Sequence, residues 1–72
     1  MSTLKLCTEV AGTVWKILAA PGAALAAGDV VLVMESMKME IPVEAPRAGR
    51  LAEVRVAEGD MLGEGDVVAI ME

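Results

Sequence analysis

Apolar residues occur along the chain in short runs, and glycine, proline and aspartate separate these runs at regular intervals. Short runs rich in valine and isoleucine between such residues are typical of β-strands. The alanine-rich segment 18–27 favours a helix by composition, but Pro21-Gly22 interrupts it and the residues after this pair are too few for a stable helix. We expect a loop there with one short strand, and seven or eight short strands in an all-β chain.

The chain repeats itself after 37 residues. The block Gly28-Asp29-Val30-Val31 reappears as Gly65-Asp66-Val67-Val68, and Met34-Glu35 returns as Met71-Glu72. The glycines that recur in this register, which we expect to be structural turn residues, are Gly12, Gly22, Gly28, Gly49, Gly59 and Gly65. Gly-Asp turns are common in β proteins, but their frequency alone would not explain why the apolar positions between the glycines also match. The sequence therefore predicts two copies of one β motif, related by an approximate two-fold axis, in a small sandwich or flattened barrel.

Between the two copies, segment 31–46 has the pattern of a β-hairpin with a two-residue turn at Met37-Lys38. The expected facing pairs are Ser36 with Met39, Glu35 with Glu40, Met34 with Ile41, and Leu32 with Val43. Because side chains alternate across a strand, the residues Leu32, Met34, Ile41 and Val43 share one apolar face. The other, mostly polar face carries Val33, Glu35, Glu40, Pro42 and Glu44.

The tip of this hairpin is poorly chosen for stability alone. Methionine and lysine are disfavoured in a tight hairpin turn, where Asn-Gly is the usual choice. Glu35 faces Glu40, a like-charge pair that destabilises a sheet, and Met37 and Met39 expose apolar side chains beside Lys38. A lone surface lysine is usually a solvated charge, and methionines usually fill a core. Their convergence on one tip predicts a recognition element for a modifying enzyme.

Composition excludes several kinds of function. The 72 residues suffice for one domain, 1–72, and carry a net charge of −5 with one aromatic residue and no histidine. Such a chain is a poor nucleic-acid binder and lacks the residues of most metal sites and nucleophilic triads. Cys7 is the single cysteine, which fits a reducing, cytoplasmic location, and no segment has the pattern of a signal peptide or membrane span. Any chemistry is expected to use an attached group.

The motif Glu35-Ser36-Met37-Lys38-Met39-Glu40 resembles the biotin-attachment motif of biotin carboxyl carrier proteins, whose usual form is Ala-Met-Lys-Met. Ser36 stands in place of the usual alanine. The resemblance covers nearly the whole chain, through Gly-Thr-Val at Gly12, Gly-Asp at Gly28, Ala-Pro before Gly49 and Glu-Gly-Asp at Glu58. It implies a flattened β-barrel of two four-stranded antiparallel sheets. The inserted "thumb" of some bacterial carriers is absent, so the chain is similar to short, single-domain carriers and, with Met1 at its start, is expected to be a complete protein.

The resemblance also implies the function. Biotin would be joined to Lys38 by a biotin protein ligase, with Met37 and Met39 as flanking recognition residues and Glu35, Ser36 and Glu40 as weaker ones. The chain would carry carboxybiotin between a biotin carboxylase and a carboxyltransferase in a carboxylase of the acyl-CoA (acetyl-CoA) type. By itself it would catalyse nothing, would bind neither nucleic acid nor membrane, and would be monomeric as an isolated domain.

Other interpretations remain open. A lipoyl carrier has the same fold and modifies a hairpin lysine, although Met37 and Met39 argue against it. The tip could instead be an unmodified docking module. A small enzyme would use Glu35, Glu40 and Lys38 as acid and base, but we expect no pocket in so small a β domain. Three further residues are expected to be structural: a partly buried Trp15, a quiet Cys7, and Pro42 in an edge position.

Overall fold

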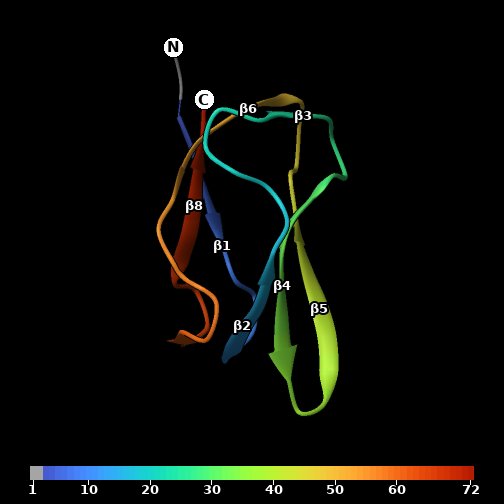
Figure 1. Cartoon of the computed structure of the whole chain (residues 1–72), viewed down its shortest axis with the longest axis vertical. Coiled ribbons are helices and arrows are strands. Elements are labelled where there is room, and N and C mark those ends of the chain that lie inside the picture. The colour runs from blue at the N-terminus through green and yellow to red at the C-terminus, as the bar shows by residue number, and fades with distance from the viewer. Residues whose placement is uncertain (1–2) are drawn as a thin grey trace.

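All eight secondary-structure elements in the computed structural model, which describes residues 3–72, are β-strands, as expected (Figure 1). They are β1 (Leu4–Cys7), β2 (Gly12–Ile17), β3 (Ala24–Leu25), β4 (Val30–Ser36), β5 (Met39–Glu44), β6 (Gly49–Val54), β7 (Met61–Leu62) and β8 (Val67–Met71). The strands form two four-stranded antiparallel sheets with the orders β1-β8-β6-β3 and β5-β4-β2-β7. Segment 18–27 is a loop with one short strand, also as expected. No helix in the described part of the chain is long and apolar enough to cross a membrane.

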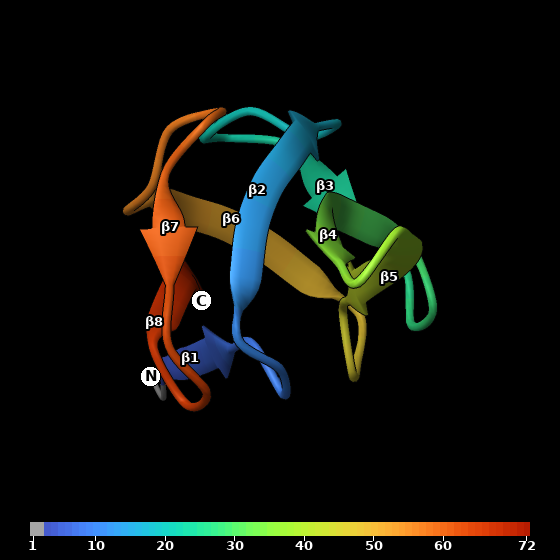
Figure 2. The ribbon, with the colours of Figure 1, turned by 90° about the horizontal axis from the view of Figure 1, so that it is seen from below.

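The predicted internal repeat is visible in the backbone hydrogen bonds. The Gly22 amide donates to the Leu51 carbonyl at 2.7 Å, and the Gly59 amide donates to the Val14 carbonyl at 2.8 Å. The second bond joins the repeat equivalents of the first, because Gly59 lies 37 residues after Gly22 and Val14 lies 37 residues before Leu51. Gly22 and Gly59 share a φ of +94°, which an L side chain adopts only with strain. The two halves of the chain therefore adopt one conformation, and each contributes strands to both sheets (Figure 2).

The core lies between the two sheets, where the inward-facing side chains of both halves meet. Its buried members are Leu6, Val14, Leu25, Val31, Leu32, Met34, Val43, Ala45, Leu51, Val68, Ala69 and Met71. Burial of this apolar surface is the main stabilising contribution in so small a domain.

Two of the six recurring glycines are not turn residues, contrary to the sequence prediction. Gly12 and Gly49 begin β2 and β6 and have no positive φ. A Cβ atom on Gly49 would lie 2.6 Å from the carbonyl oxygen of Glu72, and one on Gly12 would collide with the carbonyl oxygen of Glu35. Glycine is needed at these positions because another backbone passes against it. The other four glycines have the positive φ expected of turn residues.

The structure also tests three expectations about single residues. Pro42 lies in β5, an edge strand, as expected. Trp15 is only partly buried, with 46% of its surface exposed. The Cys7 side chain, expected to be a quiet structural thiol, is exposed at the end of edge strand β1 and therefore lies outside the core.

Candidate functional site

The hairpin β4–β5 extends from the body of the molecule and ends in the turn that carries Lys38 (Figure 1). Its register is the predicted one, with Ser36 opposite Met39 and Met34 opposite Ile41. The two strands run farther along the long axis of the molecule than their neighbours. A two-stranded antiparallel ribbon is stiff when one face packs on a core, and here Leu32, Met34 and Val43 are buried. The body of the domain therefore holds the position of the tip.

The turn itself adopts a conformation that its residues disfavour. Met37 has a φ of 50° and Lys38 a φ of 66°, and they are the two non-glycine residues with positive φ within residues 3–72. Positive φ at both central residues is the requirement of a type I′ turn, which matches the twist of the two strands. Each L side chain in this region costs roughly 1–2 kcal/mol relative to the ordinary conformation. Glycine at these two positions would relieve the strain, yet the turn consists of Met37 and Lys38. This points to a functional role for the two side chains.

The tip side chains have almost no contact with the rest of the protein. Met37 is 94% exposed and Met39 is 61% exposed, while Lys38 is also exposed. The one salt bridge among the described residues joins Arg55 to Glu53, so the Lys38 amine has no carboxylate partner there. An amine in this setting is open to attack an activated carboxyl group, and an amide-linked biotin would fit at its end without displacing any side chain.

The end of the hairpin next to the turn is fastened to the loop between β1 and β2. The Ser36 hydroxyl donates a hydrogen bond of 2.8 Å to the carbonyl oxygen of Ala11. Directly beyond it, Gly12 packs against the Glu35 backbone. The sequence did not reveal the contribution of Ala11, although the alignment of Gly12 with Gly49 was a signal that the position is special. These contacts limit rocking of the tip relative to the body.

Carboxylates flank the tip on the outer face of the hairpin. Glu35 and Glu40 are paired across β4 and β5, and both are exposed. Like charges at this spacing repel modestly, since water screens them. Their placement gives the approach to Lys38 an acidic border, which suits a basic partner surface.

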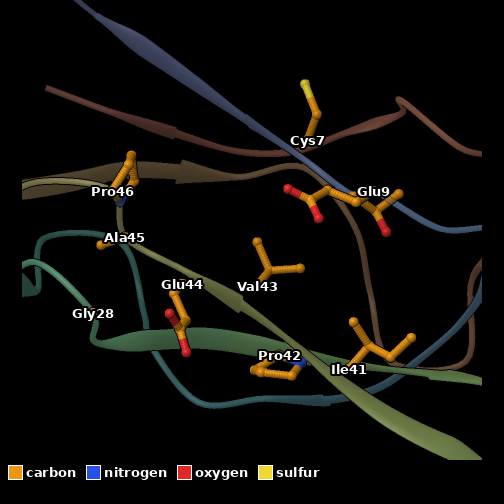
Figure 3. Close-up of a pocket in the computed structure, with 10 residues that line it drawn as sticks. Cys7, Glu9, Gly28, Ile41, Pro42, Val43, Glu44, Ala45 and Pro46 are labelled. Atoms are coloured by element: carbon orange, nitrogen blue, oxygen red, sulfur yellow. The ribbon is translucent and has the colours of Figure 1, made fainter.

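A groove of about 550 Å³ runs between β5 and the end of β1, contrary to the expectation of no pocket (Figure 3). Cys7 and Glu9 line one side of it, and Ile41, Val43 and Glu44 line the other. Neither Lys38 nor its neighbours Glu35 and Glu40 are among the lining residues. The groove therefore does not bring together the acid and base residues that an enzyme at the tip would need. No group of three metal-ligating side chains occurs within residues 3–72.

The chain matches the model of a known family over almost its whole length. The model is that of a biotin and lipoyl attachment family, described as "Biotin-requiring enzyme", and it matches residues 5–71. Over 60 residues the chain is 45% identical to the Biotin/lipoyl attachment protein of Bacillus subtilis, covering 83% of this chain and 82% of that protein. It is 40% identical over 63 residues to the Biotinylated protein TB7.3 homolog of Mycobacterium leprae, covering 88% and 89% of the two chains.

Larger proteins contain a region similar to this chain. The urea amidolyase of Saccharomyces cerevisiae is 37% identical over 65 residues, which is 90% of this chain but 4% of that protein. The crystal structure of the Kluyveromyces lactis urea carboxylase superposes on all of this chain with a TM-score of 0.95 and 36% identity, over 6% of its own length. A single-chain, multi-domain long-chain acyl-CoA carboxylase covers 96% of this chain with a TM-score of 0.90 and 36% identity, over 7% of its length. The chain thus corresponds to a small part of each large enzyme.

Proposed function

The chain belongs to the biotin and lipoyl attachment family, and from that premise we propose that it is a biotin carboxyl carrier with biotin on Lys38. The carrier serves a biotin-dependent carboxylase, moving between a biotin carboxylase site and a carboxyltransferase site whose acceptor is an acyl-CoA. The observation that carries this proposal is the exposed Lys38 at a strained tip with methionine on both sides. The names of the relatives support biotin as the attached group.

The residues of this chain have simple tasks in that process. The Lys38 amine attacks the carboxyl carbon of the biotin adenylate that the ligase makes from biotin and ATP. The amide bond forms as the bond between that carbon and the phosphate oxygen of AMP breaks, AMP leaves, and the amine proton passes to water or to the ligase. Biotin, once attached, supplies a ring nitrogen that accepts and releases a carboxyl group. Met37 and Met39 offer apolar contact area to the ligase and to the carboxylase sites, because they lack partners on their own domain. Ser36 and Gly12 hold the end of β4 in place directly below the turn.

We further propose that the chain has no catalytic activity of its own and acts as a monomer in the cytoplasm. Its physical contribution is effective concentration, since a tethered group visits two sites without diffusing away. The exposed tip leaves no pocket in which Lys38 and a carboxylate could exclude water, and acid–base catalysis in bulk water is weak.

Lipoate is the second candidate for the attached group, because the family includes lipoyl attachment and one relative carries both names. Both groups would form the same amide with Lys38. The methionines on either side of Lys38 favour biotin.

The test is the intact mass of the protein after incubation with a biotin protein ligase, ATP and biotin. The wild type should gain one biotinyl group and Lys38→Arg none, while the matched control Lys16→Arg should gain one. A parallel reaction with a lipoyl ligase and lipoate distinguishes the second candidate. If neither ligase modifies the chain while each modifies a known acceptor in the same tube, the tip is a docking element and the carrier proposal is wrong.

A further inference from the structure

Large apolar side chains are exposed in two places within residues 3–72. Met37 and Met39 belong to the hairpin tip. The other three, Trp15, Leu18 and Met61, are 46%, 56% and 86% exposed. They lie on or beside β2 and β7, which belong to the same sheet as the hairpin. We call these three residues the apolar face.

Trp15 lies on the outside of the sheet, beside a β-bulge that turns Lys16 outward as well. Val14 is buried and pairs with Met34, the next pair joins Lys16 to Val33, and Trp15 is the extra residue between them. A bulge of this kind turns two consecutive side chains to one face. The Lys16 amine accordingly lies 5.6 Å from the centre of the Trp15 ring, a cation–π contact on the outer surface.

Met61 and Leu18 flank Trp15 on the same surface. Met61 pairs with Thr13 across β7 and β2, and Thr13 is two residues from Trp15 on the strand, so the two large side chains are diagonal neighbours. For Leu18, the internal repeat supplies the direction. Its equivalent Arg55 forms a salt bridge of 3.8 Å with Glu53, which is the equivalent of Lys16. Position 18 therefore shares the outer surface with position 16.

The internal repeat also acts as a control for what the fold requires. The second copy has the same bulge at Ala52, between the pairs of Leu51 and Glu53 with β8. The repeat equivalents of Trp15, Leu18 and Met61 on the side of the opposite sheet are Ala52, Arg55 and Ala24. The same backbone conformation therefore forms on the opposite sheet with small or charged side chains at these positions. The large apolar residues of the hairpin sheet contribute little to folding and need another explanation.

The charges around the apolar face indicate the kind of surface that would cover it. Glu35 lies opposite Thr13, and the Glu58 carboxylate accepts a hydrogen bond of 3.0 Å from the Ile17 amide beside the face. Glu40 continues this acidic border toward the tip. A second copy of the chain is a poor occupant, because two molecules with a net charge of −5 repel and symmetric pairing would bring the same glutamates together.

We propose that the apolar face is a docking surface for the biotin carboxylase subunit, and this inference rests on the proposed carrier function. That enzyme binds ATP and bicarbonate, both anions, and positive charge around its site would complement the acidic border. The face is also continuous with the tip. Val33, beside Trp15, precedes Lys38 by five residues along one strand and turn, roughly 15–17 Å at strand spacing. A subunit that receives the tip is therefore close enough to cover the face.

The test measures binding of the purified biotin carboxylase subunit of the protein's own host to the biotinylated chain and to its Lys38→Arg form. The face variant combines Trp15→Ala, Leu18→Arg and Met61→Ala, which introduces at each position its repeat equivalent from the opposite side of the domain. Trp15→Ala alone should raise Kd about tenfold and the triple variant further, since aromatic anchors dominate interfaces. The matched control Arg55→Leu, on the opposite sheet, should leave Kd unchanged. Circular dichroism and biotinylation by the ligase check that each variant folds.

A second readout reports on the face directly. Trp15 is the single tryptophan, so 5-fluorotryptophan gives one fluorine NMR signal, which should shift and broaden when the unlabelled subunit is added. Unchanged Kd in the folded triple variant, or an unmoved fluorine signal during binding, overturns the proposal. Sedimentation that shows a dimer of the wild type, lost in the triple variant, assigns the face to a second copy instead. If the wild type is not biotinylated, the carrier proposal fails. If the wild type is biotinylated and the triple variant binds with unchanged Kd, the chain is a carrier that docks through another surface.

Discussion

Gly12 lies so close to Glu35 that a Cβ atom on Gly12 would collide with the Glu35 carbonyl oxygen. This contact joins the start of β2 to the end of β4, directly below the tip. The same relationship recurs between Gly49 and Glu72 in the second copy. A close backbone approach at this point sets the angle at which the hairpin leaves the body of the domain.

Gly12→Ala should destabilise the protein and loosen the hairpin. The added methyl group must displace backbone, which costs about 1–3 kcal/mol in a packed structure. For a domain of this size, each kcal/mol lowers Tm by roughly 4–8 °C. Thermal unfolding followed by circular dichroism measures the effect. Gly22→Ala is the matched control, because its site has open space but a φ of +94°, so it isolates conformational strain from collision. An unchanged Tm for Gly12→Ala would contradict the collision.

Met37→Gly should separate stability from recognition. Glycine relieves the strain of φ 50° and loses no packing, because Met37 is 94% exposed. Relief of the positive-φ strain stabilises the folded state, and the greater conformational entropy that glycine loses on folding offsets part of this gain. The net stabilisation is about 0.5–1 kcal/mol. We expect a higher Tm together with a fall of about tenfold in kcat/KM for the ligase, equivalent to about 1.4 kcal/mol of transition-state binding. Met39→Gly, in a strand, should instead lower Tm. Full ligase efficiency in Met37→Gly would show that Met37 is not recognised.

Glu40→Lys should stabilise the hairpin by replacing a repulsive pair with an attractive one. Glu35 and Glu40 face each other across the strands, and such pairs contribute roughly 0.2–1 kcal/mol. The gain should shrink at high salt, since both side chains are exposed. Denaturant unfolding at low and high ionic strength measures it, with Glu40→Gln expected in between. A gain that does not depend on salt would have to come from something other than charge.

Much of the hairpin was predictable from the sequence, for a physical reason. With the turn at Met37-Lys38, alternation places Leu32, Met34 and Val43 on one face, and a slip by one residue would turn one strand's apolar side chains to solvent. The internal repeat was equally visible, because four of its glycines need a positive φ. The attachment of biotin to Lys38 and the roles of its neighbours remain predictions.

The rest depends on tertiary contacts that periodicity does not encode. The bulge at Trp15 interrupts the alternation, so that Lys16 lies on the outer face together with Trp15. Gly12 and Gly49 resemble turn glycines in the sequence, but the need for them comes from a strand distant along the chain. Cys7 was expected to be a quiet structural thiol, but its place at the end of an edge strand leaves the side chain exposed.

The internal symmetry makes a last prediction, for Asp29 and Asp66. Each carboxylate accepts a hydrogen bond from the backbone amide three residues earlier, at 2.9 Å from Ala26 and 2.8 Å from Gly63. Alanine at either position leaves the turn amide without that partner, at a cost of about 1 kcal/mol. Because the two turns are equivalent, Asp29→Ala and Asp66→Ala should lower stability by the same amount within about 0.5 kcal/mol, and their effects should add. Denaturant unfolding of both single variants and the double variant tests this. Unequal costs would show that the two halves, although alike in backbone, do not contribute equally to stability.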